Sequence, residues 1–170
     1  MATHEMAFTD HFDRFCDGLR SGGLLLVSLD AGGRPNVMTI GWAQLGVVWG
    51  RPICTVLVRP SRYTYGCMEA TGDFTVCVPG EELSDDVVFC GTRSGRDYDK
   101  LAECGFTPTK SMHVKSPGIA QCEAIYECRI VQRNDVVPEN LLPEIDQSAY
   151  ASGDYHRVYF GEVLASYRME

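Results

Sequence analysis

The sequence has no apolar run of about 18 residues, so we expect no membrane-spanning helix. The first residues also lack the charged-then-apolar order of a signal peptide, which favours a cytoplasmic protein. Basic residues are few: 15 Lys and Arg stand against 23 Asp and Glu, a net charge of −8. Domains that bind nucleic acid through their overall field are usually basic, so we expect no nucleic-acid partner.

Several chemical motifs are absent as well. No Gly-x-Gly-x-x-Gly follows a strand, which argues against a separate dinucleotide-binding domain, and Gly91-x-x-x-Gly95-Arg96 lacks the Gly-Lys-Ser/Thr of a nucleotide P-loop. The four histidines show no metal-type spacing, and no Ser/His/Asp order or carboxylate pair indicates a hydrolase. We therefore expect no metal site and no residue acting as general acid or base.

The eight cysteines include no Cys-x-x-Cys. Without a secretory context, a disulfide framework is not expected. Several thiols lie inside apolar, strand-like runs, where cysteine packs as a small hydrophobe. Cys90 and Cys104 are the best candidates for the opposite interpretation, a thiol pair that exchanges electrons with a cofactor. The packing interpretation is favoured because the spacing offers no ready resolving partner.

What is present is an ordinary globular composition, with 45% hydrophobic and 22% charged residues. A length of 170 residues predicts one domain over residues 1–170. Alternation and turn residues predict six strands, at 24–29, 36–42, 53–58, 74–78, 120–132 and 157–167. Helical patterns are expected at 8–19, 62–70, 81–89 and 97–104, with Ser61 as the N-cap of the second.

Residues 133–154 form an acidic stretch with two prolines, expected to be a loop or insertion longer than an ordinary hairpin loop. The strands do not follow a βαβ rhythm. We therefore expect a mainly β fold, an antiparallel barrel decorated by short helices.

Five of the 15 basic residues fall within one part of this acidic chain, namely Arg59, Arg62, Arg93, Arg96 and Lys100. Ser61, Thr64, Thr92 and Ser94 accompany them. Helix N-termini with arginine, lysine and hydroxyl donors suit a phosphate dianion. The alternative is a solvated basic face that balances nearby acids such as Asp97 and Asp99.

Five segments then appear in a familiar order. They are Asn-Val-Met-Thr-Ile-Gly-Trp from Asn36, Arg-Pro-Ser-Arg-Tyr-Thr-Tyr from Arg59, Thr-Gly-Asp-Phe from Thr71, Gly-x-x-Ser-Gly-Arg-Asp-x-Asp-Lys from Gly91, and Phe-Gly-Glu-Val from Phe160. Over roughly residues 8–168 the chain resembles the flavin reductase-like family, in particular its flavoredoxin branch. The resemblance implies an FMN-binding split β-barrel of Greek-key topology, paired as a homodimer with flavin near the subunit interface.

The resemblance also implies site residues. The strand with Asn36, Thr39 and Trp42 is expected to lie against the flavin, and Arg59, Ser61, Arg62 and Thr64 to meet the ribityl phosphate. Lys100 matches the family's lysine near the cofactor, and Ser94 of the same loop is also expected to bind the cofactor. His156 matches a histidine that approaches FMN. Without the resemblance, Trp42 fits a core position equally well, and His156 fits a surface or capping one better.

The expected function is an FMN-dependent oxidoreductase, because a flavin supplies the redox chemistry and the protein binds and orients it. In this interpretation the expected electron donor is NADH or NADPH. The alternatives are a flavoredoxin-like carrier served by a protein redox partner, and a non-catalytic flavin-binding barrel. Family members often continue past the last strand with an aromatic residue that covers the flavin. Since this sequence stops at Glu170, that cover is expected to be absent or supplied elsewhere. Loop 133–154 is a candidate substitute, with Tyr150 or Tyr155 as the covering aromatic residue.

Overall fold

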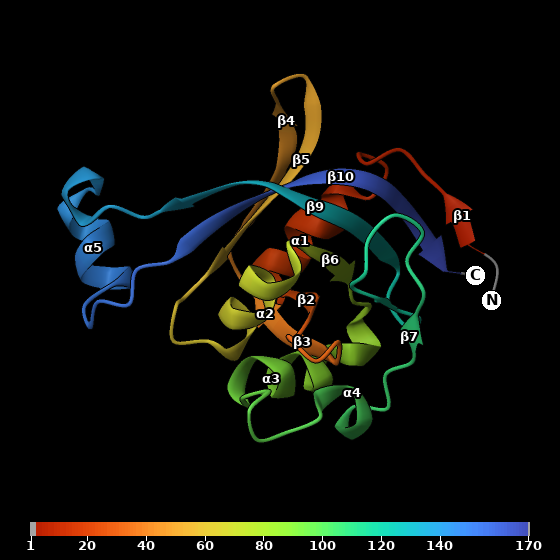
Figure 1. Cartoon of the computed structure of the whole chain (residues 1–170). Helices are drawn as coiled ribbons and strands as arrows, with labels where there is room; N and C mark the ends of the chain where they lie inside the picture. Colours follow the sequence, from red (N-terminus) through yellow and green to blue (C-terminus); the bar gives the residue numbers. More distant parts are fainter. Residues whose placement is uncertain (1–2, 170) are drawn as a thin grey trace.

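A computed structural model describes residues 3–169 and shows mostly antiparallel strands (Figure 1). The strands are β1 (Thr3–Glu5), β2 (Leu24–Leu29), β3 (Pro35–Ile40), β4 (Ala43–Val48), β5 (Arg51–Val58), β6 (Asp73–Val78), β7 (Pro108–Thr109), β8 (Gly118–Ile119), β9 (Ala124–Asp135) and β10 (Arg157–Met169). The helices are α1 (Phe12–Ser21), α2 (Tyr63–Thr71), α3 (Ser84–Thr92), α4 (Lys100–Glu103) and α5 (Pro143–Ala149), with short 3₁₀ turns η1 (Glu81–Leu83) and η2 (Pro138–Asn140). None of these helices is long and apolar enough to cross a membrane. The mainly β class expected from the sequence is confirmed.

The main sheet runs β3-β2-β6-β9-β10-β5-β4, with β1 added to β10. Ile40 of β3 and Val56 of β5 lie toward opposite ends of this order, yet both belong to one buried cluster. The sheet therefore curls around that cluster, as antiparallel barrels do.

Strand β2 is buried on both faces. Leu24 and Leu26 point into the barrel cluster, whereas Leu25 and Val27 belong to a second cluster covered by α3 and α4. Burial on both faces explains why β2 reads as a continuous apolar run instead of an alternating one. The second cluster holds α3 and α4 against the outside of the barrel, next to the end of β3.

Several expected elements differ in extent. The strand expected at 36–42 ends at Ile40, and a strand that was not predicted, β4, follows it. Strand β4 has no buried residue and contains Gly46, so it lacks the apolar alternation that marks a half-buried strand. The helix expected at 97–104 is only α4, because its first residues form turns around Ser94.

The start of α2 also differs from expectation. Arg62, not Ser61, occupies its N-cap and makes no side-chain capping bond. The Ser61 hydroxyl instead donates to Asp154, 93 residues away. This contact was invisible to local sequence reasoning, and it leaves the helix N-terminus uncapped.

The segment expected to be a loop at 133–154 is an arm. It begins with β9 continuing to Asp135, and the chain then passes through η2 and α5 before β10 begins at Arg157. An ion pair from Arg157 Nε to Asp135 Oδ1, 2.7 Å long, closes the base of the arm. Figure 1 shows the arm projecting to the left of the barrel, and the β4–β5 hairpin projecting upward.

On the other side, the loop between β7 and β8 is fixed by two buried carboxylates. Glu127 accepts hydrogen bonds from the backbone N–H groups of Met112 and His113, at 2.8 and 2.7 Å. Asp73 accepts from the backbone of Lys115 and from both the backbone and the hydroxyl of Ser116. We call this arrangement the carboxylate clamp.

Candidate functional site

Four segments far apart in the sequence meet at one end of the barrel: the end of β3, the start of α2, the loop after α3 and the start of β10. Between them lie two adjoining cavities of about 180 and 160 Å³, which share Met38, Thr39 and Arg62 as lining residues. We call the first the cradle, lined also by Ser61, Thr64, Ser94 and Lys100. The second is the ring end, lined also by Trp42, Arg59 and His156. Together they form one groove.

The charge of the cradle is positive. Lys100 is only 4% exposed, and its Nζ donates to the carbonyl oxygen of Cys90 at 2.8 Å. Burial lowers the pKa of Lys100, and Arg62 lowers it further. Among the described residues, neither Lys100 nor Arg62 forms an ion pair with a carboxylate. A buried ammonium group without a counter-ion is costly, so this arrangement suits an anion supplied from outside the chain.

The N-terminus of α2 strengthens this field. The helix spans nine residues, and no side chain caps its first N–H groups. Uncapped N–H groups and the partial positive charge of a helix N-terminus favour a bound anion. The helix end, Arg62 and Lys100 thus provide three independent positive contributions to the same cavity.

The cradle wall is packed closely. Asn36 Nδ2 donates to Thr64 Oγ1 at 2.8 Å, and both residues are buried. Thr39 Oγ1 donates to the carbonyl of Val87, which ties β3 to α3. A Cβ built on Gly95 would lie 2.0 Å from Asn36 Oδ1, so only glycine lets this loop approach β3 so closely.

Arg59 lies at the ring end, and its guanidinium forms hydrogen bonds with the arm. Its Nη1 and Nη2 donate to the carbonyl oxygens of Ala149, Gly153 and Asp154 at 2.8–3.2 Å. It also lies 5.1 Å from the ring centroid of Tyr150. Arg59 therefore holds the arm against the groove, and Ser61 does the same through Asp154.

His156 and its neighbours form the far wall of the ring end. The Tyr150 hydroxyl lies 2.8 Å from His156 Nδ1. The Trp42 ring packs at a tilt against the His156 imidazole, with the two ring centroids 4.8 Å apart. Burial, with a smaller contribution from Arg59, lowers the pKa of His156 to about 4. The imidazole is therefore neutral at physiological pH. When Tyr150 donates to Nδ1, the remaining proton is on Nε2.

All ten sequence-predicted site residues lie in or beside this groove. Nine line its cavities and Asn36 lies beneath them, bonded to Thr64: Asn36, Thr39, Trp42, Arg59, Ser61, Arg62, Thr64, Ser94, Lys100 and His156. Asp154, which orients Ser61, was not identified from the sequence. It lies at a positive φ of 58° within Gly-Asp-Tyr-His, and that turn-like segment was the only available signal.

Two cysteines adjoin the cradle. Cys90 and Cys104 have their sulfur atoms 3.9 Å apart, a proximity that the sequence spacing did not indicate. Burial is the main reason that both pKa values rise, that of Cys104 to about 12. Both thiols are therefore protonated at neutral pH, which favours packing over nucleophilic exchange.

Comparison with known proteins places the fold and the family. Residues 18–168 match the family described as "Flavin reductase like domain". An uncharacterised protein of Archaeoglobus fulgidus is 34% identical over 131 residues, which cover 77% of this chain and 64%, less than two thirds, of that relative.

Solved structures agree. Flavoredoxin of Desulfovibrio vulgaris (Miyazaki F) superimposes with a TM-score of 0.70 at 23% identity, covering 86% of this chain and 69% of that chain. An FMN-binding domain of a flavin reductase-like enzyme from Shewanella baltica gives 0.68 at 21% identity, covering 98% and 77%. The expected split β-barrel is confirmed, and the chain belongs to the flavin reductase-like family.

Proposed function

We propose that this member of the flavin reductase-like family binds FMN in the groove, with the phosphate in the cradle. The observation that carries this proposal is the buried Lys100, which lines the cradle together with Arg62 and the uncapped N-terminus of α2. Neither Lys100 nor Arg62 has a carboxylate counter-ion among the described residues. A phosphate dianion would neutralise these groups. The S. baltica neighbour, described as FMN-binding, supports the choice of flavin.

At the ring end, the chain provides groups of the kind that a flavin ring system needs. Trp42 is 45% exposed and offers an aromatic face next to the groove. The neutral His156 offers an N–H donor at Nε2, held in place by Tyr150. Arg59 fixes the arm that carries Tyr150, so its main role in the proposed site is to position the wall.

The proposed activity is electron transfer through this flavin, which supplies the redox chemistry when bound. NADH or NADPH is the proposed donor. The D. vulgaris neighbour is a flavoredoxin, so the second candidate function is a carrier reduced by a protein partner.

We further propose a homodimer. The β4–β5 hairpin exposes Val47 and Trp49 at 65% and 61%, and the arm exposes Leu142 at 59%. Strands β3 and β4 end the sheet order, and exposed sheet edges are usually covered in native proteins. Light scattering at micromolar concentration is expected to give twice 18.8 kDa. A monomer with full flavin occupancy would contradict this part of the proposal.

Titration with FMN and with riboflavin tests the flavin proposal. The two differ only in the phosphate, so FMN is expected to bind roughly tenfold to a thousandfold more tightly, the equivalent of one or two charge-assisted hydrogen bonds. Equal affinities would remove the phosphate from the cradle. Anaerobic mixing of the loaded protein with NADH or NADPH then separates the two candidate functions, because bleaching of the flavin absorption is expected only for the first.

A further inference from the structure

The hydroxyl of Ser61 lines the cradle, but a carboxylate of the chain already binds it. The hydroxyl donates to Asp154 Oδ2, and the Ser61 backbone N–H donates to Asp154 Oδ1 at 3.2 Å. A serine hydroxyl has a single proton to donate. Ser61, which was expected to meet the phosphate, therefore cannot donate its hydroxyl proton to a phosphate while it holds Asp154.

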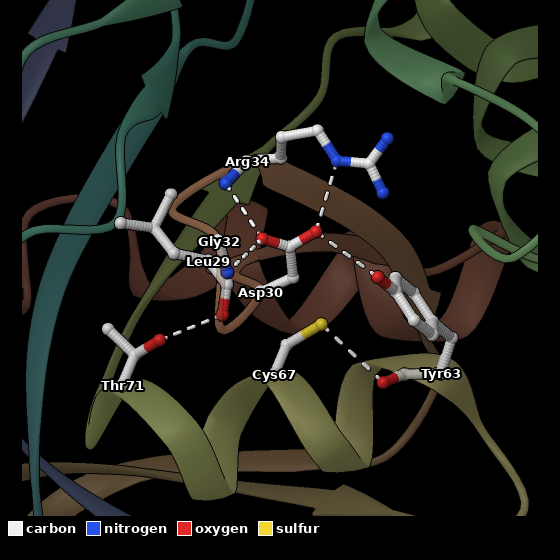
Figure 2. Close-up of polar contacts among 7 residues, drawn as sticks. All are labelled: Leu29, Asp30, Gly32, Arg34, Tyr63, Cys67 and Thr71. Carbon is white, nitrogen blue, oxygen red and sulfur yellow. Dashed lines mark hydrogen bonds and ion pairs between the residues drawn. The ribbon is translucent and has the colours of Figure 1, made fainter.

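Two aspartates lie beside the start of α2, and they are bound in different ways. Asp30, shown in Figure 2, accepts three hydrogen bonds from the turn between β2 and β3 and a fourth from the Tyr63 hydroxyl. In the described part of the chain, Asp154 accepts only from Ser61. A carboxylate bound by one residue is displaced at lower cost than one with four bonds from several groups.

The start of α2 is fixed, whereas the arm is held less firmly. Figure 2 shows α2 bonded to the end of β2 and to the turn after it, through the hydroxyl groups of Tyr63 and Thr71. In the arm, α5 has no buried residue. If the contact between Ser61 and Asp154 opens, we therefore expect the arm to move and the helix to stay.

The backbone at Asp154 does not require the carboxylate. Its φ of 58° lies in the left-handed region, as does the φ of 75° at Gly153, and glycine adopts this conformation without strain. Arg59 binds the backbone carbonyl oxygens of both residues, so this anchor of the arm does not depend on the Asp154 side chain. The contact with Ser61 is what the carboxylate adds.

We propose that the Asp154 carboxylate competes with the flavin phosphate for Ser61, and that this competition couples FMN binding to the attachment of the arm. The inference rests on the proposed function, which puts the phosphate in the cradle with Lys100 and Arg62. One hydroxyl proton makes one strong hydrogen bond, and two anions at that distance repel each other. Because the two equilibria are linked, removing the Asp154 charge strengthens FMN binding.

The test is titration of the whole protein with FMN and with riboflavin, in the wild type and in Asp154→Asn. Asparagine tolerates the left-handed conformation and keeps the shape of the side chain, so the fold is expected to persist. FMN affinity is expected to rise roughly tenfold, the equivalent of one charge-assisted hydrogen bond, while riboflavin affinity stays within about twofold. Glu144→Gln, which removes one negative charge from an exposed position of the arm, is the matched control.

A second background shows whether the effect passes through Ser61. In Ser61→Ala, the Asp154→Asn substitution is expected to change FMN affinity by less than about threefold, because no hydroxyl is left to compete for. An equal gain in both backgrounds, or no gain in the otherwise wild-type protein, would overturn the inference. A wild type that binds FMN no more tightly than riboflavin would instead overturn the proposed function.

Hydrogen exchange of the ligand-free protein tests the coupling to the arm. Ser61→Ala removes the hydroxyl without changing the arm itself, so the amide groups of residues 146–155 are expected to exchange faster than in the wild type. Ser94→Ala, which removes a cradle hydroxyl bonded within its own loop, is the control. Unchanged exchange in Ser61→Ala would show that the contact does not hold the arm, and the coupling would be wrong.

Discussion

The carboxylate clamp and the cradle both bury charge, but they differ in how many internal hydrogen-bond partners that charge has. In the clamp, Glu127 and Asp73 receive five hydrogen bonds of 2.6–3.1 Å from the loop between β7 and β8. In the cradle, the ammonium group of Lys100 donates to one carbonyl, with Arg62 adding positive charge nearby. A buried charge with a complete set of internal partners holds a structure together. One whose partners are incomplete indicates a ligand.

The largest effect is expected at the clamp. Glu127→Ala would leave the backbone N–H groups of Met112 and His113 without their acceptor. Each unsatisfied buried group costs about 1–3 kcal/mol, and these two N–H groups are only partly buried, so unfolding in urea should show a loss of about 2–4 kcal/mol. Glu139→Ala, on an exposed residue of the arm, is the control. A Glu127→Ala protein as stable as its parent would mean that the clamp is not structural.

In the cradle, by contrast, removing the buried charge should weaken ligand binding and leave stability unchanged or higher. Lys100→Met removes an ammonium group that lacks a carboxylate partner, and it keeps an apolar stem of similar length. FMN affinity is expected to fall roughly tenfold to a hundredfold, the value of one charge-assisted hydrogen bond. The ligand-free protein should be no less stable, because apolar replacement of a buried charge is often neutral or stabilising. Thermal melts with and without FMN measure both effects, and a lower melting temperature without FMN would place Lys100 with the structural charges.

At the ring end, His156 is expected to make stability depend on pH. Its pKa in the folded protein, about 4, lies below the ordinary 6.5, so the unfolded chain binds the proton more readily. The contribution of His156 is therefore complete above pH 6.5 and is lost as the pH falls toward 4. Urea midpoints at pH 7 and pH 5 should differ less in His156→Gln than in the wild type, and His113→Gln, on an exposed residue, is the control. Equal pH dependence in all three proteins would contradict a neutral, buried imidazole.

The smallest effect is expected at the thiols beside the cradle. If Cys90 and Cys104 are packing residues, anaerobic dithionite titration of the FMN-loaded protein should take up two electrons per flavin. Cys104→Ser should leave that number unchanged. Four electrons, falling to two in the variant, would show that the pair is a redox centre after all.

The sequence predicted which residues meet at the groove better than it predicted the contacts that those residues make. Arg62, Thr64 and Lys100 were chosen from the basic segment, and the structure places all three around one cavity. Arg59 could not be assigned to the arm in advance, because its acceptors are backbone carbonyls 90–95 residues away and carry no side-chain signature. The same holds for Ser61, whose partner Asp154 depends on how the arm folds back.

The extent of the elements shows a similar division. Strand β2 was predicted accurately because burial on both faces produces a continuous apolar run. Strand β4 was missed because none of its residues is fully buried, and its pairing with β5 is made by backbone groups that any residue provides. The arm was predicted as a loop because the few turns of α5 have no buried face to impose a helical pattern.

By itself, the sequence determined the mainly β class, the family and the concentration of positive charge in an acidic chain. Periodicity, composition and ordered motifs are properties of the sequence itself, and they can be recognised without knowledge of the fold. Only the tertiary structure decided which charges are already paired. Whether Lys100 or Glu127 finds internal partners depends on backbone groups brought close by strand pairing and loop packing, and the amino-acid sequence does not display those distances.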